Sequence, residues 1–261
     1  MSEPKIRYDD GAAYEHMMGV WSRFAGEIFL DWLAPPSGLR WIDIGCGNGV
    51  FTELLVERCS PLEVQGIDPS EGQLAFARTR LSSRVAEFRQ GDAMALPFPA
   101  GRFAAAVMAL VITFVPDPMK CVEEMVRVVS PGGIVATYMW DVGGGGSPFA
   151  PTVAEMRAMG LTPSLASRVD ASRMDTLRGL WTAAGLEAVE TREIAVTRTF
   201  ADFDDFWMTN VKSGTVGPTL AAMASGNVET LKGRLRARLP ADSQGHITTG
   251  ARAHAVKGHR A

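Results

Sequence analysis

The stretch Trp41-Ile42-Asp43-Ile44-Gly45-Cys46-Gly47-Asn48-Gly49-Val50 decides the fold of this chain, because in it an apolar run passes directly into a glycine-rich turn. Glycines let a ligand approach the backbone closely, and the free N–H groups at the start of a following helix supply partial positive charge. The stretch therefore predicts a buried strand, a ligand-binding turn and a helix, in that order. Taken alone, such a turn is a general signal of a nucleotide-binding fold.

The spacing of the glycines separates two kinds of ligand. A dinucleotide-binding turn has the pattern Gly-x-Gly-x-x-Gly, which would place its third glycine at position 50. This chain has Val50 there, and its third glycine is Gly49. The carboxylate of Asp43, at the end of the strand, would tolerate an amine and repel a pyrophosphate. S-adenosylmethionine (SAM) has an amine and a sulfonium but no phosphate, so the charge of the turn favours SAM.

Two further carboxylates end the next two predicted strands. Asp68 follows the strand Glu63 to Ile67, where a carboxylate can accept hydrogen bonds from both hydroxyls of a ribose. Because SAM and NAD both contain this ribose, Asp68 does not separate them. Asp92 follows the strand Val85 to Gln90, and we expect its carboxylate and the N–H of Ala93 to bind adenine. Three acidic strand ends in sequence form a specific constellation.

Strands and helices alternate from Arg40 to about Trp140, which predicts a parallel sheet with helices on both faces. The predicted strands are Arg40 to Ile44, Glu63 to Ile67, Val85 to Gln90, Phe103 to Ala109 and Ile134 to Trp140. A helix is predicted from Val50 to Cys59, and two more begin at Ser70, with Gln73 in capping-box position, and at Asp117-Pro118. Pro131-Gly132-Gly133 is predicted to end the last of them.

Flanking segments are predicted to cover this core. Residues 12–34 should form an N-terminal helix whose large apolar residues face one neighbour, at Met17, Trp21, Phe24, Ile28 and Trp32. We predict lid segments at about 143–185 and 201–240. The first begins with the glycine run Gly143 to Gly146, predicted to be flexible, and includes a helix from Val169 to Gly185. Strands are expected from Glu190 to Phe200 and from His246 to Val256, so residues 1–261 should form one domain.

Composition excludes several classes of protein. Apolar residues make up 46% of the chain and charged residues 21%, as in a soluble globular protein. The net charge of -3 gives no excess positive charge for nucleic acid. The longest apolar run, Phe103 to Val115, is shorter than the ~20 residues of a membrane helix. An odd number of cysteines (Cys46, Cys59 and Cys121) and the lack of an apolar leader favour a cytoplasmic protein.

Together these motifs resemble the class I SAM-dependent methyltransferases, in particular the type 11 group that includes quinone-biosynthesis C-methyltransferases. The matching stretches cover about residues 40 to 140; they are Ile42 to Gly49, Gly66 to Ser70, Gly91 to Ala93 with Leu96-Pro97-Phe98, and Pro116-Asp117-Pro118 to Pro131-Gly132-Gly133. The resemblance implies a Rossmann-like three-layer α/β sandwich with a seven-stranded, mostly parallel sheet and an antiparallel last strand. It also implies SAM as cofactor, with S-adenosylhomocysteine as product.

The resemblance also implies roles for residues, with Asp43 and Gly45 at the methionine end of SAM, Asp68 at its ribose and Asp92 at adenine. The stretch Tyr14-x6-Trp21-Ser22-Arg23 looks like one that closes over the cofactor in some relatives. The predicted cofactor-binding residues are Tyr14, Arg23, Asp43, Gly45, Cys46, Gly47, Asp68, Pro69, Gln73, Asp92, Ala93 and Leu110. The chain departs from a common pattern after the fourth strand, where Leu110 to Phe114 offers no acid or base.

Other functions stay open beside methyl transfer to a small molecule. A SAM-binding scaffold without catalysis would have the same cofactor residues, whereas a nicotinamide-dependent reductase is disfavoured by the pattern at Gly49 and Asp92. His16 is a candidate catalytic base, with a structural role as the alternative. We predict no metal site, because the histidines have no ligand spacing. Lids rich in Met, Trp and Phe favour an apolar or aromatic acceptor over nucleic acid. The sequence sets neither the acceptor atom nor the oligomeric state.

Overall fold

The computed structural model describes residues 18–80, 84–164 and 166–261, and a seven-stranded sheet in the order β3-β2-β1-β4-β5-β7-β6 forms its centre. The strands are β1 (Arg40–Ile44), β2 (Glu63–Asp68), β3 (Ala86–Gln90), β4 (Phe103–Ala109), β5 (Val129–Trp140), β6 (Leu186–Phe200) and β7 (Ile247–Arg260). The pairs among β1 to β5 are parallel, whereas β7 runs antiparallel to both β5 and β6. The predicted mostly parallel sheet with an antiparallel last strand is therefore confirmed.

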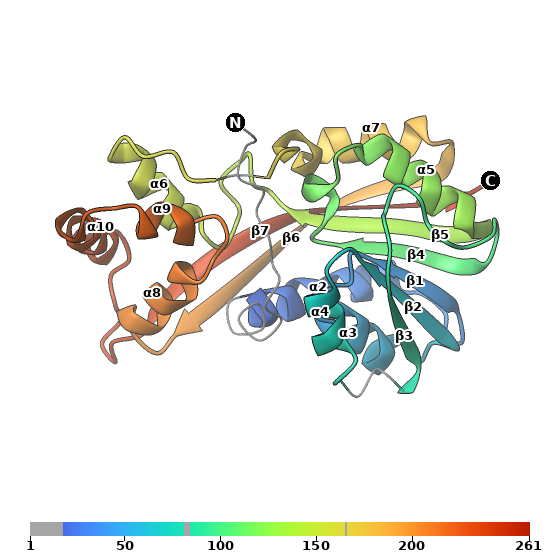
Figure 1. The fold of residues 1–261 in the computed structure, drawn as a ribbon, viewed down its shortest axis with the longest axis horizontal. Coiled ribbons are helices and arrows are strands. Elements are labelled where there is room, and N and C mark those ends of the chain that lie inside the picture. The colour runs from blue at the N-terminus through green and yellow to red at the C-terminus, as the bar shows by residue number, and fades with distance from the viewer. Residues whose placement is uncertain (1–17, 81–83, 165) are drawn as a thin grey trace.

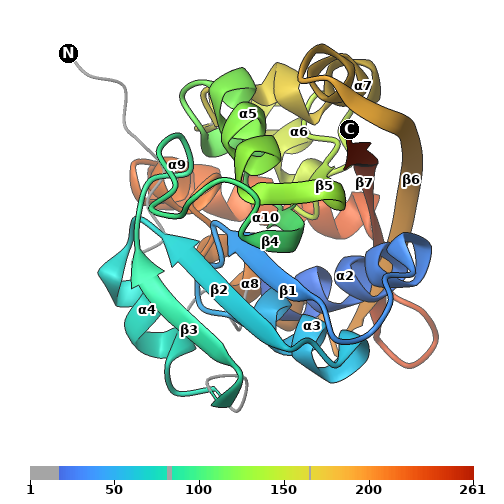
Figure 2. The same ribbon diagram turned by 90° about the vertical axis from the view of Figure 1, so that its right-hand side faces the viewer.

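Helices cover both faces of this sheet (Figures 1 and 2). On one face lie α2 (Val20–Leu33), α3 (Val50–Cys59) and α4 (Glu71–Ala77), and on the other lie α5 (Pro118–Val128) and α7 (Met174–Ala183). The predicted helix starts are confirmed, because the Ser70 hydroxyl accepts from the Gln73 N–H at 3.4 Å and the Asp117 carboxylate accepts from the Lys120 N–H at 3.1 Å.

The start of β5 differs from the prediction. The strand begins at Val129, and not at Ile134, so that the Pro131-Gly132-Gly133 turn lies inside it. Val129 pairs with Phe103, and the register then shifts before Ile134 pairs with Ala105. The extra residues form an irregularity in the strand, which a proline and two glycines tolerate without ending the pairing.

The buried face of α2 also differs from the prediction, which counted only large apolar residues. Phe24 is 38% exposed, and Ile28 and Trp32 are partly buried. The buried residues are Trp21, Ser22, Ala25, Gly26, Phe29, Leu30 and Leu33. A Cβ at Gly26 would lie 2.8 Å from Cδ2 of Leu54, so the glycine lets α2 pack closely against α3. The small residues of α2 therefore determine which of its faces packs against α3.

The last two strands extend beyond the rest of the sheet. β7 pairs with β5 only from Ala253 to His259, whereas its pairing with β6 continues to Ile247. Around this extension lie α6 (Ala150–Ala158), α8 (Phe203–Val211), α9 (Gly217–Ala221) and α10 (Ser225–Arg238), as Figure 1 shows. The predicted lid segments therefore lie partly together, at the end of the sheet reached by Trp140.

The predicted lid at 143–185 is divided in the structure. Its expected helix from Val169 is broken at Arg173, which has extended backbone (φ -76°, ψ 139°) between a short 3-10 helix, Val169–Ser172, and α7. Leu177 and Trp181 of α7 are fully buried, so α7 belongs to the helical layer on the sheet and not to a lid. The Gly143 to Gly146 run forms a turn in which the Gly144 N–H donates to Asp141 Oδ1 at 2.9 Å.

None of the described helices is long and apolar enough to cross a membrane.

A tryptophan links α7 to the centre of the sheet. The Trp181 indole N–H donates to the Val135 carbonyl on β5 at 2.9 Å. We expect Trp181→Phe to lower the free energy of unfolding by about 2 to 3 kcal/mol, since it shrinks a buried side chain and leaves a buried carbonyl without its donor. Trp32→Phe, at a partly buried site, should cost under ~1 kcal/mol. Urea unfolding of both variants checks this, and equal losses would contradict it.

Candidate cofactor site

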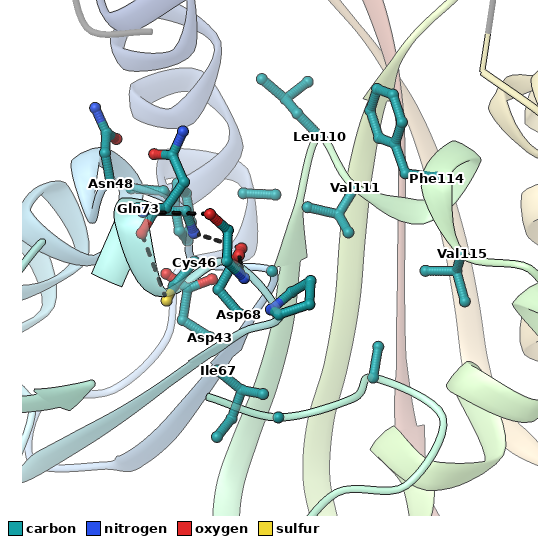
Figure 3. A pocket seen from close by; sticks show the side chains of 18 of the residues that line it. Asp43, Cys46, Asn48, Ile67, Asp68, Gln73, Leu110, Val111, Phe114 and Val115 are labelled. Atoms are coloured by element: carbon teal, nitrogen blue, oxygen red, sulfur yellow. Dashed lines mark hydrogen bonds between the residues drawn. The ribbon is translucent and has the colours of Figure 1, made fainter. Parts of the chain in front are cut away.

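A cavity of about 840 Å³ opens at the carboxyl ends of β1, β2 and β4. The chain leaves β1 toward β2 and β3 on one side and continues through β4 on the other, so the cavity lies where the strand order reverses. Open α/β sheets bind their ligands at such switch points. Asp43, Cys46 and Asp68 lie on one side of the space, and Leu110 and Phe114 face them from the other (Figure 3).

The glycine-rich turn is held close to the opposite wall. Gly45 has a positive φ of 73°, and a Cβ there would lie 2.5 Å from Cγ2 of Val111. Gly49 also has a positive φ (80°) and precedes α3 as its N-cap residue. The backbone conformation at both positions, and the contact with Val111 at Gly45, therefore favour glycine even when no ligand is bound.

Asp43 is the most unusual group in the cavity, because its carboxylate is completely buried. Oδ2 accepts a hydrogen bond from the Thr52 hydroxyl of α3 at 2.6 Å, whereas Oδ1 has no hydrogen-bond partner among the described residues. Burial raises the pKa of Asp43 to about 7, against the lowering effect of Thr52 and with a small further increase from Asp68. A buried acceptor without a donor marks a place for a ligand that donates, such as an ammonium group.

Ser22 is a cavity residue that the sequence analysis did not select. It lies on the buried face of α2 and lines the same cavity as Asp43, and its buried Oγ has no hydrogen-bond partner in the part of the chain that the structure describes. One feature of the sequence could have indicated this role: Ser22 is a polar residue within a helical face of apolar and small side chains. A second unsatisfied oxygen in one cavity strengthens the case for a polar ligand there.

The Asp68 carboxylate stabilises the turn from which it projects. Its Oδ2 accepts from the Gly47 N–H at 3.0 Å and its Oδ1 from the Ser70 N–H at 2.8 Å. Each carboxylate oxygen accepts more than one hydrogen bond, so the predicted ribose contact is compatible with these bonds. Asp92 is exposed at the cavity edge, where its Oδ1 accepts from the Met94 N–H at 2.8 Å.

Leu110 closes the cavity from the β4 side with a strained backbone. Its φ of 63° is in the left-handed region, which costs a residue with a Cβ on the order of 1 kcal/mol. Its N–H donates to the Tyr138 carbonyl at 2.8 Å, which holds the turn in place. Such conformations cluster at functional sites.

Every described residue of the predicted cofactor set lines this cavity except Arg23. The ten that do so are Asp43, Gly45, Cys46, Gly47, Asp68, Pro69, Gln73, Asp92, Ala93 and Leu110. The guanidinium of Arg23 instead pairs with Glu57 at 2.8 Å and Glu27 at 3.3 Å on the surface. Tyr14 and His16 lie outside the described residues. Burial raises the pKa of the Cys46 thiol well above its ordinary value, so Cys46 is uncharged near neutral pH.

Residues 42–137 match the family model described as a methyltransferase domain, of type 11. The chain carries a methyltransferase domain over residues 42–137. The matched region begins in β1 and ends in β5, so it contains the glycine turn and the three acidic strand ends.

Known proteins with sequences similar to this domain are also named as methyltransferases. Demethylmenaquinone methyltransferase of Lactococcus lactis is 38% identical over 103 residues, 38% of this chain and 41% of that protein. Trans-aconitate 2-methyltransferase of Methylobacterium nodulans is 34% identical over 149 residues, 56% of this chain and 53% of that protein. The match thus spans about half or less of these relatives' length.

A solved structure extends the likeness in fold to most of the chain. Phosphoethanolamine N-methyltransferase 2 of Haemonchus contortus, in complex with S-adenosyl-L-methionine, superposes with a TM-score of 0.57 at 17% identity. The superposition covers 95% of this chain and 56% of that one. At this identity the likeness shows the fold alone, a Rossmann-like three-layer α/β sandwich.

The burial of Asp43 makes the stability of the ligand-free protein depend on pH. Because its pKa rises from 3.8 to about 7 on folding, folding favours the protonated carboxyl. The associated stability is fully present below pH ~4 and is lost as pH rises through 7. We expect Asp43→Asn to be more stable than the unmodified protein at pH 8, by up to ~4 kcal/mol, with the difference shrinking toward pH 5. Urea unfolding across this range checks it, and parallel curves would contradict it.

Proposed function

We propose that this protein transfers a methyl group from SAM to a small-molecule acceptor. The observation that carries the proposal is that Asp43 Oδ1 and Ser22 Oγ are both buried and unsatisfied among the described residues and line the same cavity. An α-ammonium group would donate to Asp43, and Ser22 would donate to an α-carboxylate or accept from the ammonium. Both groups occur at the methionine end of SAM, so the cavity's polar atoms suit this ligand.

The other predicted contacts complete the binding mode that we propose. Asp68 would accept from the ribose hydroxyls, and Asp92 together with the Ala93 N–H would bind adenine. These residues line the cavity in the order of their strands, so an extended ligand can meet all of them at once. A second role for Asp68, in holding the Gly47 N–H, means that the turn and the ribose contact depend on the same carboxylate.

For methyl transfer, the protein has mainly to align the acceptor with the methyl group and to exclude water from the site. Bound SAM supplies a methyl group already activated by its sulfonium. The protein must then hold the acceptor in line at about 3 to 3.5 Å, in a site closed to water. Leu110, Val111 and Phe114 form an apolar wall of the cavity that suits this task. An acceptor that is already nucleophilic needs no general base.

Two alternatives remain beside this proposal. A nicotinamide-dependent reductase needs a pyrophosphate at the glycine turn, where the Asp43 carboxylate would repel it when ionised. A scaffold that binds SAM without catalysis would keep the same cavity, so only turnover separates it from an enzyme. Catalysis is favoured by the second, apolar space that adjoins the cofactor cavity at Leu110 and Phe114.

The acceptor that we propose is a small apolar or aromatic molecule, and the location that we propose is the cytoplasm. The relatives named above act, by their names, on demethylmenaquinone and trans-aconitate, both small molecules. Cys46, Cys59 and Cys121 are buried and unpaired, which suits a reducing compartment.

Cofactor choice can be measured directly. We expect SAM and S-adenosylhomocysteine to bind with micromolar affinity, on the order of -7 to -8 kcal/mol, and NADH not to bind detectably in isothermal titration. Incubation with methyl-labelled SAM and a panel of quinols, phenols and carboxylic acids should label at least one acceptor. NADH binding of equal strength would overturn the proposal, and SAM binding without any labelling would favour the scaffold.

The ribose contact can be tested at Asp68. We expect Asp68→Ala to weaken S-adenosylhomocysteine by about 2 kcal/mol or more, roughly thirtyfold, because charged hydrogen bonds to a ligand are worth about 1.5 to 3 kcal/mol. Asp31→Ala, an exposed aspartate paired with Arg58 on the surface, is the matched control and should leave affinity unchanged. Thermal unfolding of both variants separates a lost ligand contact from a disturbed turn. Unchanged affinity in Asp68→Ala would make this carboxylate purely structural.

A further inference from the structure

A second cavity, of about 160 Å³, adjoins the cofactor cavity. Leu110 and Phe114 line both spaces, so the two meet at the turn after β4. The second space is smaller than the ~300 to 1,000 Å³ that encloses a drug-sized ligand, so it suits the reacting end of a small molecule. Most of its other lining residues come from the end of β5, from the turn that follows it and from α6.

The walls of this second cavity are mostly apolar, from Met18, Met139, Phe149 and Val153 among others. Trp140 adds a polar atom that is not satisfied. The side chain is 4% exposed, and no residue within 18–80, 84–164 or 166–261 accepts a hydrogen bond from its buried indole Nε1. The Trp140 ring is fixed by an edge contact with Trp21, at 6.4 Å between ring centroids. Buried tryptophan N–H groups normally have a partner, so an unpaired one beside a cavity indicates a ligand atom that accepts.

The charge of the second cavity restricts that ligand further. An indole N–H only donates, and the charged side chain in the lining is the exposed cation of Arg157. The other polar side chains there are the hydroxyls of Thr113, Ser147 and Thr215, which can donate or accept. Of the described residues that line this space, none is Asp, Glu or His. An ammonium ligand would therefore meet a donor and a positive charge, with neutral hydroxyls but no carboxylate to offset them, whereas a carbonyl, phenol or carboxylate oxygen would accept from the indole N–H.

We propose that Trp140 is a specificity-determining residue whose indole N–H donates to an oxygen of the methyl acceptor. The acceptor class is an apolar, ring-sized molecule that bears a hydrogen-bond-accepting oxygen, and protonated amines are disfavoured. This inference rests on the proposed function in naming the bound molecule as the methyl acceptor. The selection of oxygen over nitrogen rests on the cavity itself. A site with a buried donor discriminates strongly against a ligand that cannot accept, because the donor then stays unpaired.

Matched naphthalene probes test the proposal on the full chain, with and without saturating S-adenosylhomocysteine. Isothermal titration should show 2-naphthol and 2-naphthoate binding at least tenfold more tightly than (2-naphthyl)methylammonium. Trp140→Phe keeps an aromatic ring but removes the N–H, and we expect it to weaken 2-naphthol five- to tenfold. Trp41→Phe is the matched control, because Trp41 Nε1 is also buried and has no partner among the described residues, but Trp41 lines neither cavity. This control should bind 2-naphthol as the unmodified protein does.

An NMR measurement on the unmodified protein tests the same contact without relying on the folding of a variant. The indole N–H resonance that is missing from Trp140→Phe should move when 2-naphthol is added, and that of Trp41 should not. Equal binding of the ammonium probe, or a Trp140 resonance that stays in place at saturating 2-naphthol, would overturn the inference. Failure of S-adenosylhomocysteine to bind would instead overturn the proposed function, while the probes would still report on the second cavity.

Discussion

The hydrogen bond between the Thr52 hydroxyl and the Asp43 carboxylate joins the end of β1 to the first turn of α3. It is a demanding interaction, because it holds a completely buried carboxyl group with one oxygen satisfied and the other not. Burial of this kind costs free energy unless a ligand completes the hydrogen bonding. A fold selected only for stability would place an apolar residue here. The protein instead keeps a carboxyl group whose pKa lies near neutrality, at the point where a ligand's ammonium group would recover the cost.

The same turn sets the position of the opposite wall. Gly45 has no side chain to keep Val111 away, and a Cβ there would lie 2.5 Å from that residue. The segment after β4 can therefore lie over the glycine turn, and Leu110 takes its left-handed conformation at the point where this segment leaves the strand. Leu110 and Phe114 then divide the space into a cofactor cavity and a smaller one. The close approach of two turns thus produces two adjoining sites from one sheet edge.

The sequence predicted the central sheet and the acidic strand ends well because these depend on local patterns. Apolar runs, caps and glycine spacing are readable over a few residues, and Asp43, Asp68 and Asp92 follow from them. Residues that depend on long-range contacts were missed. Ser22 enters the cavity because Gly26 lets α2 approach α3, and the predicted face of α2 ignored such small residues. The break at Arg173, between two short helical stretches, likewise left no periodic signal.

The two cavities differ in the polar groups that line them. The cofactor cavity carries the ionisable groups, with Asp43, Asp68 and Asp92 along one side of it. The second cavity, in its described lining, offers a neutral donor at Trp140 and a cation at Arg157, and no group that could take a proton at neutral pH. An acceptor bound there must arrive with its nucleophilic atom already electron-rich. A hydrogen bond or positive charge at a neighbouring oxygen stabilises the anionic form of such a molecule, as in a phenolate or enolate. In the proposed complex these groups would favour an oxygen-bearing acceptor that has already lost its proton to solvent, without a general base, and they would give no advantage to an amine.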